Sequence, residues 1–215
     1  RVQSVALKLV VDREREIEAF KPETYYSITG VFDEFEADVF KYKTDDLEIK
    51  SLDEVNSILS KLDENFKVES IDSKNKNKAS KFPFTTSTMQ QEASTKLGFS
   101  AKKTMMLAQK MYEGIDIGVE TVGLITYMRT DSIRLSDEFV KPTFKFIEEK
   151  LGPEYVGYVK QTKKTDNVQD AHEAIRPTSI LRTPKSLEKY LSKDEFKLYN
   201  LIYKRTLASL MSDAK

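Results

Sequence analysis

One short segment of the chain places a tyrosine among charged and hydroxyl side chains, Leu124-Ile-Thr-Tyr-Met-Arg-Thr-Asp-Ser132. The phenol of Tyr127 can attack a phosphodiester, and the guanidinium of Arg129 can hold the oxygens whose charge grows in the transition state. The segment therefore fits phosphoryl transfer. The chain has ten tyrosines, however, and an isolated Tyr-x-Arg is far more often an ordinary surface feature.

A second segment, Ala171-His-Glu-Ala-Ile-Arg-Pro-Thr178, contains the only histidine of the chain. Near neutral pH, His172 can donate a proton to a phosphate or to a departing sugar hydroxyl. Glu173, Arg176 and Thr178 make the segment a short polar cluster. A lone histidine is more often a solvated or packing residue, so His172 gains weight only together with the tyrosine segment.

A third polar segment, Phe82-Pro-Phe-Thr-Thr-Ser-Thr-Met-Gln-Gln91, stands at the start of a predicted helix. The hydroxyls of Thr86, Ser87 and Thr88 and the free backbone amides of a helix start can hold a phosphate. Ordinary helix capping explains the same residues and, for this segment alone, is the favoured interpretation.

Composition narrows the remaining classes. The chain has no cysteine, which excludes a disulfide framework and thiolate metal sites and indicates a reducing compartment. Its 35 basic and 35 acidic residues balance, so any nucleic-acid surface must be local. No apolar run reaches the roughly 20 residues of a membrane span. Metal-ligand spacings, a glycine-rich phosphate loop and a serine triad are also missing.

The first third of the sequence predicts a small α+β unit. Apolar spacing predicts a helix over residues 2–20, and alternation over 25–39 predicts antiparallel strands that turn near Gly30 or Asp33-Glu34. Ser51 and Glu54 form a predicted capping box for the next helix. Phe66, Val68 and Ile71 alternate like a further strand, and a Lys-rich connector follows over residues 72–81.

The remainder predicts a mostly helical unit, so the fold class is α+β. Helices are expected over residues 85–97 and after Ser100, and Ser136 is expected to cap another. Residues 160–169 are predicted to be a polar loop, with helices resuming near Ala171. Ser192 and Glu195 form a capping box for the last helix.

Together these segments resemble a known family, the type IA DNA topoisomerases, in its bacterial topoisomerase I branch. Residues 124–132 resemble the active-site tyrosine motif and residues 171–178 the downstream histidine motif. Arg1-Val-Gln-Ser-Val-Ala6 resembles the start of a helix in the DNA-binding core, and residues 84–91 and 102–109 also fit. Met128 follows the tyrosine, whereas the topoisomerase III branch usually has proline there. The interval 112–123 looks longer than in some relatives.

The resemblance implies a strand-passage enzyme. Tyr127 would attack single-stranded DNA, leaving a 5′-phosphotyrosine and a free 3′-hydroxyl, so that religation needs no ATP. Arg129 would bind the scissile phosphate, and His172 would contact the phosphate region or assist the 3′-oxygen. The residues expected to bind DNA or support the site are Arg1, Gln3, Ser4, Thr86, Ser87, Thr88, Gln91, Thr126, Thr130, Asp131, Ser132, Glu173 and Arg176.

The resemblance also implies an architecture. Residues 1–20 would belong to the DNA-binding core, 21–78 to a strand-rich arch, and 79–215 to a helical gate domain of a torus. The chain starts at Arg1 inside a helical pattern, which indicates a segment of a longer protein. The expected partners are single-stranded DNA and the rest of the polypeptide, in a cytoplasmic, nucleoid-associated monomer with no membrane.

Magnesium enters through the same resemblance. Mg²⁺ would be bound by a Toprim domain outside this chain, and no metal is expected within it. The chain alone is therefore expected to bind DNA weakly and not to relax supercoils. Measurable Mg²⁺-dependent relaxation by the 215-residue chain would contradict this.

Two other classes were compared with this assignment. A structural or single-strand-binding relative could keep the fold without the chemistry, but the joint presence of Tyr127, Arg129 and His172 argues against it. A tyrosine recombinase would need several arginines and histidines around its nucleophile in another order, and that pattern is not found.

Overall fold

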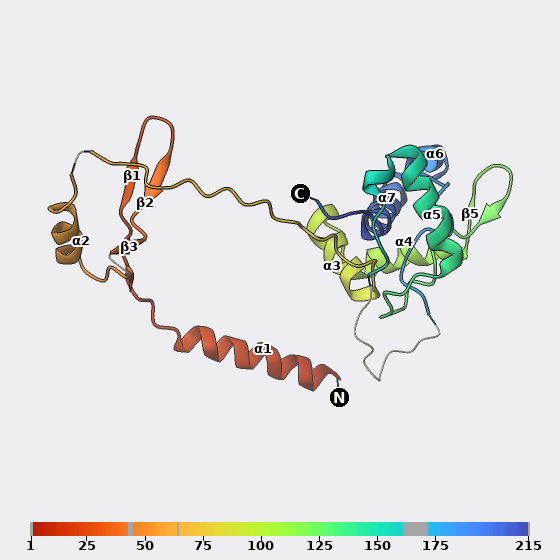
Figure 1. Cartoon of the computed structure of the whole chain (residues 1–215). Helices are drawn as coiled ribbons and strands as arrows, with labels where there is room; N and C mark the ends of the chain where they lie inside the picture. The colour runs from red at the N-terminus through yellow and green to blue at the C-terminus, as the bar shows by residue number, and fades with distance from the viewer. Residues whose placement is uncertain (1, 43–44, 64, 161–171, 215) are drawn as a thin grey trace. The chain divides into compact units, whose positions relative to one another are not determined.

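The computed structural model describes residues 2–42, 45–63, 65–160 and 172–214. The chain forms two compact units, Arg1–Asp72 and Ser73–Lys215. Figure 1 shows the helices and strands of the chain. Helices and short strands both occur, which confirms the mixed α and β content expected from the sequence.

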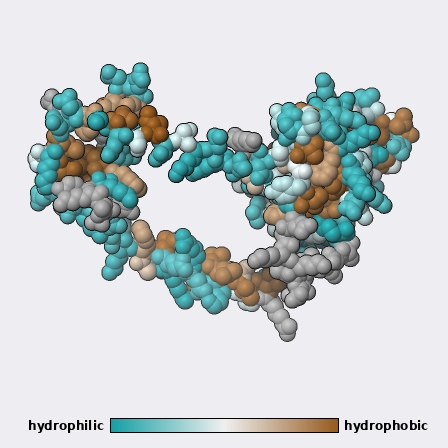
Figure 2. Space-filling model, viewed as in Figure 1, coloured by the Kyte–Doolittle hydropathy of each residue, from teal (hydrophilic) through white to brown (hydrophobic). Residues whose placement is uncertain are grey.

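The first unit opens with helix α1, Val2–Ala19, as the apolar spacing predicted. None of its residues is buried, and apolar residues lie exposed between polar ones along it (Figure 2). Its charged middle is paired locally, with Lys8 bonded to Asp12 and Arg13 to Glu16 at 2.7 Å. The charged residues in the middle of α1 are therefore solvated and locally paired.

Two small hairpins follow α1. Strand β1, Thr29–Val31, pairs antiparallel with β2, Glu36–Asp38, and β3, Lys41–Tyr42, pairs with β4, Asp45–Asp46. The first hairpin turns at Asp33-Glu34, where the amide of Phe32 donates to the carbonyl of Phe35 at 2.9 Å. Of the two turns that the sequence allowed, the Asp33-Glu34 turn is the one that forms.

Helix α2, Leu52–Leu59, begins as predicted at Ser51, whose hydroxyl accepts from the amide of Glu54. The Glu54 carboxylate accepts instead from the amide of Lys50 at 2.8 Å, so the reciprocal half of the predicted box is displaced by one residue. The predicted strand over residues 66–71 was wrong. In the described part of the chain this segment has no strand partner and its side chains are exposed.

The second unit is built from four long helices and short connecting elements. The long helices are α3 Thr86–Leu97, α4 Ala101–Glu113, α5 Asp137–Lys150 and α7 Lys193–Ser209. The short elements are β5 Ile115–Asp116, β6 Thr121–Val122, η1 Pro153–Tyr155, α6 Pro184–Leu187 and η2 Glu188–Tyr190. Leu198, Tyr199 and Ile202 of α7 are fully buried, which places α7 in the core.

The helix starts follow their capping residues. Ser100 accepts from the amide of Lys103 at 3.2 Å at the start of α4, and Ser192 and Glu195 form the predicted capping box of α7. Gly98 ends α3 with a φ of 69°, a left-handed conformation that favours glycine. Ser136 precedes α5 but makes no cap hydrogen bond with its side chain.

The expectation that helices resume near Ala171 was wrong. Ala171 and the predicted polar loop, apart from Lys160, lie outside the described residues, and the next helix, α6, begins only at Pro184. Between them, Ile175 and Pro177 form β-bridges with Phe84 and Ile125. Pairing with distant segments thus replaces the local helix.

The connector between the units belongs partly to the second one. The amide of Lys78 donates to the carbonyl of Ala214 at 2.7 Å, and the amide of Ala214 donates back at 3.1 Å. This two-way pairing explains why the compact units divide after Asp72, upstream of the predicted boundary at residue 78. No helix in the described ranges is long and apolar enough to cross a membrane.

The start of α7 generates a prediction about pH. Burial opposes ionisation of Glu195, but hydrogen bonds from Lys110, at 2.6 Å, and from Ser192 hold the pKa of its carboxyl below 4.5. The ionised carboxylate therefore stabilises the fold above pH 4.5, and this contribution is lost as pH falls through the lower folded-state pKa. Glu195→Gln should lower the free energy of unfolding at pH 7 by about 1–3 kcal/mol.

Urea unfolding measured from pH 7 down to pH 3 checks this, since the difference from wild type should shrink at the acidic end. Glu188→Gln is the matched control, because Glu188 is exposed and forms no ion pair with another described residue. A pH-independent difference for Glu195→Gln would contradict the assignment.

Candidate active site

Tyr127 lies between two other rings at the surface of the second unit. Its side chain is 37% exposed. Its ring meets the edge of Tyr112, with centroids 5.4 Å apart, and tilts toward His172 at 5.7 Å. The structure thus places the only histidine of the chain beside this tyrosine, and the phenol stays accessible to a substrate.

A depression of about 390 Å³ lies next to this pair. Arg129, Asp131 and His172 line it together with hydroxyl-bearing residues, namely Thr86, Ser87 and Thr130. The charged groups come from two segments that are about 40 residues apart in sequence, and the hydroxyls add a third. Guanidinium, imidazole and hydroxyl donors on one surface can bind a phosphate, while the Asp131 carboxylate can only accept.

The tyrosine segment is held to the histidine segment mainly through Thr126. The Thr126 hydroxyl donates to the carbonyl of Ala174 at 2.6 Å and accepts from the amide of Arg176 at 3.0 Å. The Thr126 amide donates to the Arg176 carbonyl at 2.9 Å, and the Thr178 amide donates to the Leu124 carbonyl at 3.0 Å. His172 is therefore only two residues from a carbonyl that is anchored to the residue before Tyr127.

Thr86 makes the corresponding connection to the start of α3. Its hydroxyl donates to the carbonyl of Met128 at 2.7 Å and accepts from the amide of Thr130 at 2.9 Å. Its own amide donates to the Thr130 carbonyl at 2.8 Å. Because Arg129 lies between these two residues, Thr86 fixes the backbone that presents the guanidinium.

The side chains of the tyrosine segment divide between the core and solvent. Ile125 and Met128 are buried in the core, whereas Tyr127 and Arg129 are exposed. Met128 and Arg129 lie in a bend of the chain, and both neighbours of the buried Met128 reach solvent.

Comparison with known proteins places this geometry in a family. The family model described as DNA topoisomerase matches residues 1–215, the whole chain. A solved structure of full-length topoisomerase I from Thermotoga maritima is 43% identical to the chain, with a TM-score of 0.75, and the match covers 99% of the chain.

This chain belongs to the bacterial type IA DNA topoisomerases. It spans 33% of the length of the Thermotoga maritima chain that it matches.

Glu173 and Arg176 of this topoisomerase chain form an ion pair next to His172 in the sequence, and neither lines the depression. Arg176 Nε donates to Glu173 Oε2 at 2.6 Å, and the guanidinium lies over the Phe139 ring at 4.3 Å. Burial opposes ionisation of Glu173, but hydrogen bonds from Arg176 and Ser136 keep the pKa of its carboxyl below the usual value. The Ser136 hydroxyl is hydrogen-bonded to Arg176 and Glu173, which explains why it does not cap α5.

The other residues expected at the site fall in different places. Thr88 completes a capping box, accepting from the amide of Thr85 at 2.9 Å, so the capping interpretation holds for it. Ser132 is buried and its hydroxyl accepts from the amide of Arg134. Gln91 is exposed on α3 and does not line the depression.

The N-terminal residues expected to bind DNA precede the second unit in the sequence. Gln3 and Ser4 lie on α1 in the first unit, and Arg1 lies outside the described residues. Their role in DNA binding therefore stays a prediction.

The contact of Tyr112 with Tyr127 was not predicted from any sequence pattern. Gly123 permits this approach, because a Cβ at this position would lie 2.8 Å from the carbonyl oxygen of Tyr112. The amide of Leu124 then donates to the Met111 carbonyl at 2.7 Å. The interval that looked long in the sequence forms the β5–β6 hairpin between these contacts.

The family implies a bound Mg²⁺, and we tested whether the described residues could hold it. No cluster of three or more His, Asp or Glu side chains in these ranges could bind a metal ion. The described residues therefore do not fit the metal.

The Thr126 hydroxyl generates a second prediction. Thr126→Val should lower the free energy of unfolding by about 1–3 kcal/mol, because the buried Ala174 carbonyl and the Arg176 amide both lose a partner. Urea denaturation measures the change. Thr121→Val is the matched control, since Thr121 is exposed on β6. An equal loss of unfolding free energy in the two variants would show that the hydrogen bonds of the Thr126 hydroxyl do not stabilise the fold.

Proposed function

We propose that Tyr127 is the nucleophile with which this topoisomerase cleaves one strand of DNA. The observation that carries the proposal is the convergence of three chemically suited groups. An accessible phenol lies beside the His172 ring, and His172 and Arg129 line the same depression. An isolated surface tyrosine would not need this arrangement.

The reaction would be an exchange of phosphodiester bonds. The Tyr127 oxygen attacks phosphorus and loses its proton, while the bond from phosphorus to the 3′-oxygen breaks and that oxygen gains a proton. The products are a 5′-phosphotyrosine and a free 3′-hydroxyl. Since one phosphodiester replaces another, little energy is lost, and the reverse attack by the 3′-hydroxyl reseals the strand without ATP.

Arg129 and His172 would act on the reacting phosphate. A guanidinium donates several hydrogen bonds in a fixed fork and suits non-bridging phosphate oxygens, whose charge grows in the transition state. His172, with its ring centroid 5.7 Å from that of Tyr127, would contact the phosphate or protonate the departing 3′-oxygen. Ser87 and Thr130 would complete the phosphate-binding surface.

The proposal extends to the complete protein. We place residues 1–20 in the DNA-binding core, residues 21–78 in a strand-rich arch and residues 79–215 in a gate that opens a torus for strand passage, so that negative supercoils relax. The 43% identity to a full-length topoisomerase I supports this assignment. We further propose a cytoplasmic monomer that acts on single-stranded DNA, with Mg²⁺ bound outside this chain.

The nucleophile is tested with the complete protein and a single-stranded oligonucleotide labelled at its 3′ end, because the fragment with that end carries the 5′-phosphate that becomes bonded to the tyrosine. Tyr127→Phe should abolish the covalent adduct seen after denaturation and leave equilibrium binding nearly intact. Tyr112→Phe is the matched control, because Tyr112 is the neighbouring exposed phenol and should still permit the adduct. An undiminished adduct with Tyr127→Phe would end the assignment.

The role of Arg129 is tested by the rate of cleavage. Arg129→Ala should slow adduct formation by about 10²–10³-fold, the usual cost of removing a donor that stabilises transition-state charge. Arg134→Ala should cleave at nearly the wild-type rate, since Arg134 is exposed but does not line the depression. Similar rates for the two variants in single-turnover cleavage would contradict the proposed role.

A further inference from the structure

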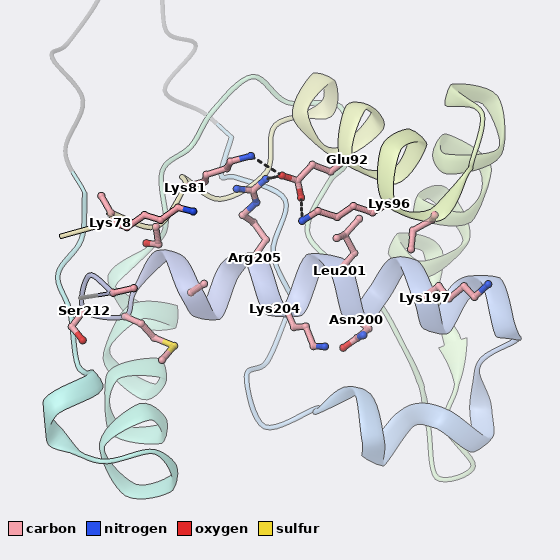
Figure 3. A pocket seen from close by; sticks show the side chains of 16 residues that line it. Lys78, Lys81, Glu92, Lys96, Lys197, Asn200, Leu201, Lys204, Arg205 and Ser212 are labelled. Atoms are coloured by element: carbon pink, nitrogen blue, oxygen red, sulfur yellow. Dashed lines mark hydrogen bonds and ion pairs between the residues drawn. The ribbon is translucent and has the colours of Figure 1, made fainter. Parts of the chain in front are cut away.

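A larger groove lies in the second unit, apart from the Tyr127 depression (Figure 3). It has a volume of about 640 Å³ and lies between α3, α7 and the connector at residues 78–81. None of its lining residues belongs to the depression beside Tyr127. The groove is therefore a separate feature of the same compact unit.

The lining of the groove is strongly basic. Six of its sixteen residues are Lys or Arg and only one is acidic, whereas the chain as a whole is neutral. The basic residues are Lys78, Lys81, Lys96, Lys197, Lys204 and Arg205. Such a local concentration of positive charge attracts polyanions, whatever the net charge of the chain.

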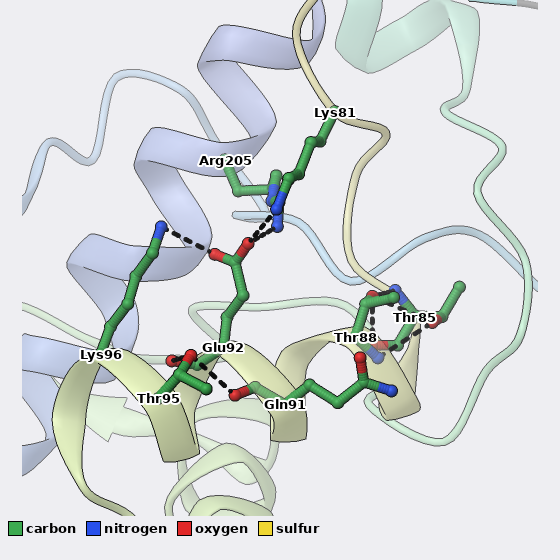
Figure 4. A network of polar contacts seen from close by, with 8 residues as sticks. All are labelled: Lys81, Thr85, Thr88, Gln91, Glu92, Thr95, Lys96 and Arg205. Atoms are coloured by element: carbon green, nitrogen blue, oxygen red, sulfur yellow. Dashed lines mark hydrogen bonds and ion pairs between the residues drawn. The ribbon is translucent and has the colours of Figure 1, made fainter. Parts of the chain in front are cut away.

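The one carboxylate in the groove is already neutralised (Figure 4). Glu92 forms ion pairs with Lys96 at 3.0 Å, with Lys81 at 3.2 Å and with Arg205. Burial opposes its ionisation, but these cations hold the pKa of Glu92 below its usual value. Three of the six cations are thus paired with Glu92. Its single negative charge therefore does not neutralise the other three cations of the groove.

The other three cations are available to a ligand. Lys78, Lys197 and Lys204 are exposed and, within the ranges described, form no ion pair. Asp194 lies near enough to feel the charge of Lys197, but its carboxylate is bonded to Lys103 at 2.6 Å. The groove therefore presents uncompensated positive charge to solvent.

The spacing of these cations indicates the shape of the ligand. Lys197 and Lys204 are two turns apart on α7, about 10 Å along its axis. Lys78 lies over the opposite end of α7 from Lys197, near Ser212 (Figure 3). Three cations spread along a helix cannot converge on one phosphate, but they match a row of phosphates.

The rest of the lining indicates how such a chain would be held. Leu97, Leu201 and Met211 give the groove an apolar floor, and none of its lining residues is aromatic. Proteins that hold single strands by their bases stack them on aromatic rings. Without rings, the groove would grip the phosphate backbone by charge and would not read the sequence.

We propose that this groove is a second DNA contact, which binds the backbone of a single strand without reading its bases. The inference rests on the proposed function, because DNA is the polyanion that this enzyme would handle. Helix α3 contributes to both surfaces, Thr86 and Ser87 to the depression and Lys96 to the groove. The bound strand is either a continuation of the cleaved one or a different strand.

The test combines Lys78→Gln, Lys197→Gln and Lys204→Gln in the complete protein, in a Tyr127→Phe background so that binding stays non-covalent. Affinity for a fluorescent oligonucleotide of roughly 30 nucleotides, longer than a single binding site, is measured over a range of salt concentrations. We expect the affinity to fall about tenfold or more, and the slope of log affinity against log salt to decrease by about 2.

The matched control combines Lys102→Gln, Lys141→Gln and Lys185→Gln, which remove the same charge from exposed positions outside the groove. This control should bind with nearly wild-type affinity. Equal effects in the two triple variants would overturn the groove assignment. Thermal melting checks that both are folded, and the single variant Lys204→Gln, with a smaller loss, replaces the triple variant if that variant melts early.

A short oligonucleotide of about 6 nucleotides identifies the source of the strand. If the cleaved strand continues into the groove, the triple variant weakens long oligonucleotides only. If a different strand binds there, the variant loses a second equivalent of the short one. The triple variant is also made with Tyr127 restored. If it binds DNA with unchanged affinity and still forms the adduct, the groove proposal is wrong and the nucleophile proposal stands. If the wild-type protein forms no adduct, the nucleophile proposal is wrong. The binding measurements with the triple variant still test the groove, because they do not depend on cleavage.

Discussion

The surface around Tyr127 depends on two threonine hydroxyls that each donate one hydrogen bond and accept another within the fold. Thr126 joins the tyrosine segment to the histidine segment, and Thr86 joins it to the start of α3. Their partners are backbone groups, some of them in the buried core, where an unsatisfied polar group costs about 1–3 kcal/mol. The same bonds therefore hold the fold together and set the positions of Arg129 and His172.

The hydrophobic core fixes the outward direction of the reactive groups. Met128 is fully buried at a bend of the chain, and its neighbours Tyr127 and Arg129 are exposed to solvent. Phe84 extends this connection toward the basic groove, because its carbonyl accepts from the amide of Ile175 and its ring lies under the Arg205 guanidinium at 4.6 Å. Phe84 thus contacts both the histidine segment and a cation of the groove.

Local chemistry made part of this structure predictable from sequence. Ser100 and the Ser192–Glu195 box mark their helices correctly, since a cap acts within one turn. The missing helix near Ala171 and the missing strand at residues 66–71 depend on which distant partners are present, and a local pattern does not contain that information.

The same limit applies to the candidate site. Residue types made Tyr127, Arg129 and His172 candidates, the family resemblance selected them, and the structure brings them together. Residue types could not show which residues line the depression. Glu173 and Arg176, which were expected at the site, form an ion pair with each other and do not line it. The measurement that tests the account most directly is peptide mapping of a DNA adduct trapped from the complete protein. A 5′-phosphate is expected on the Tyr127 peptide, and a phosphate on any other tyrosine would contradict Tyr127 as the nucleophile.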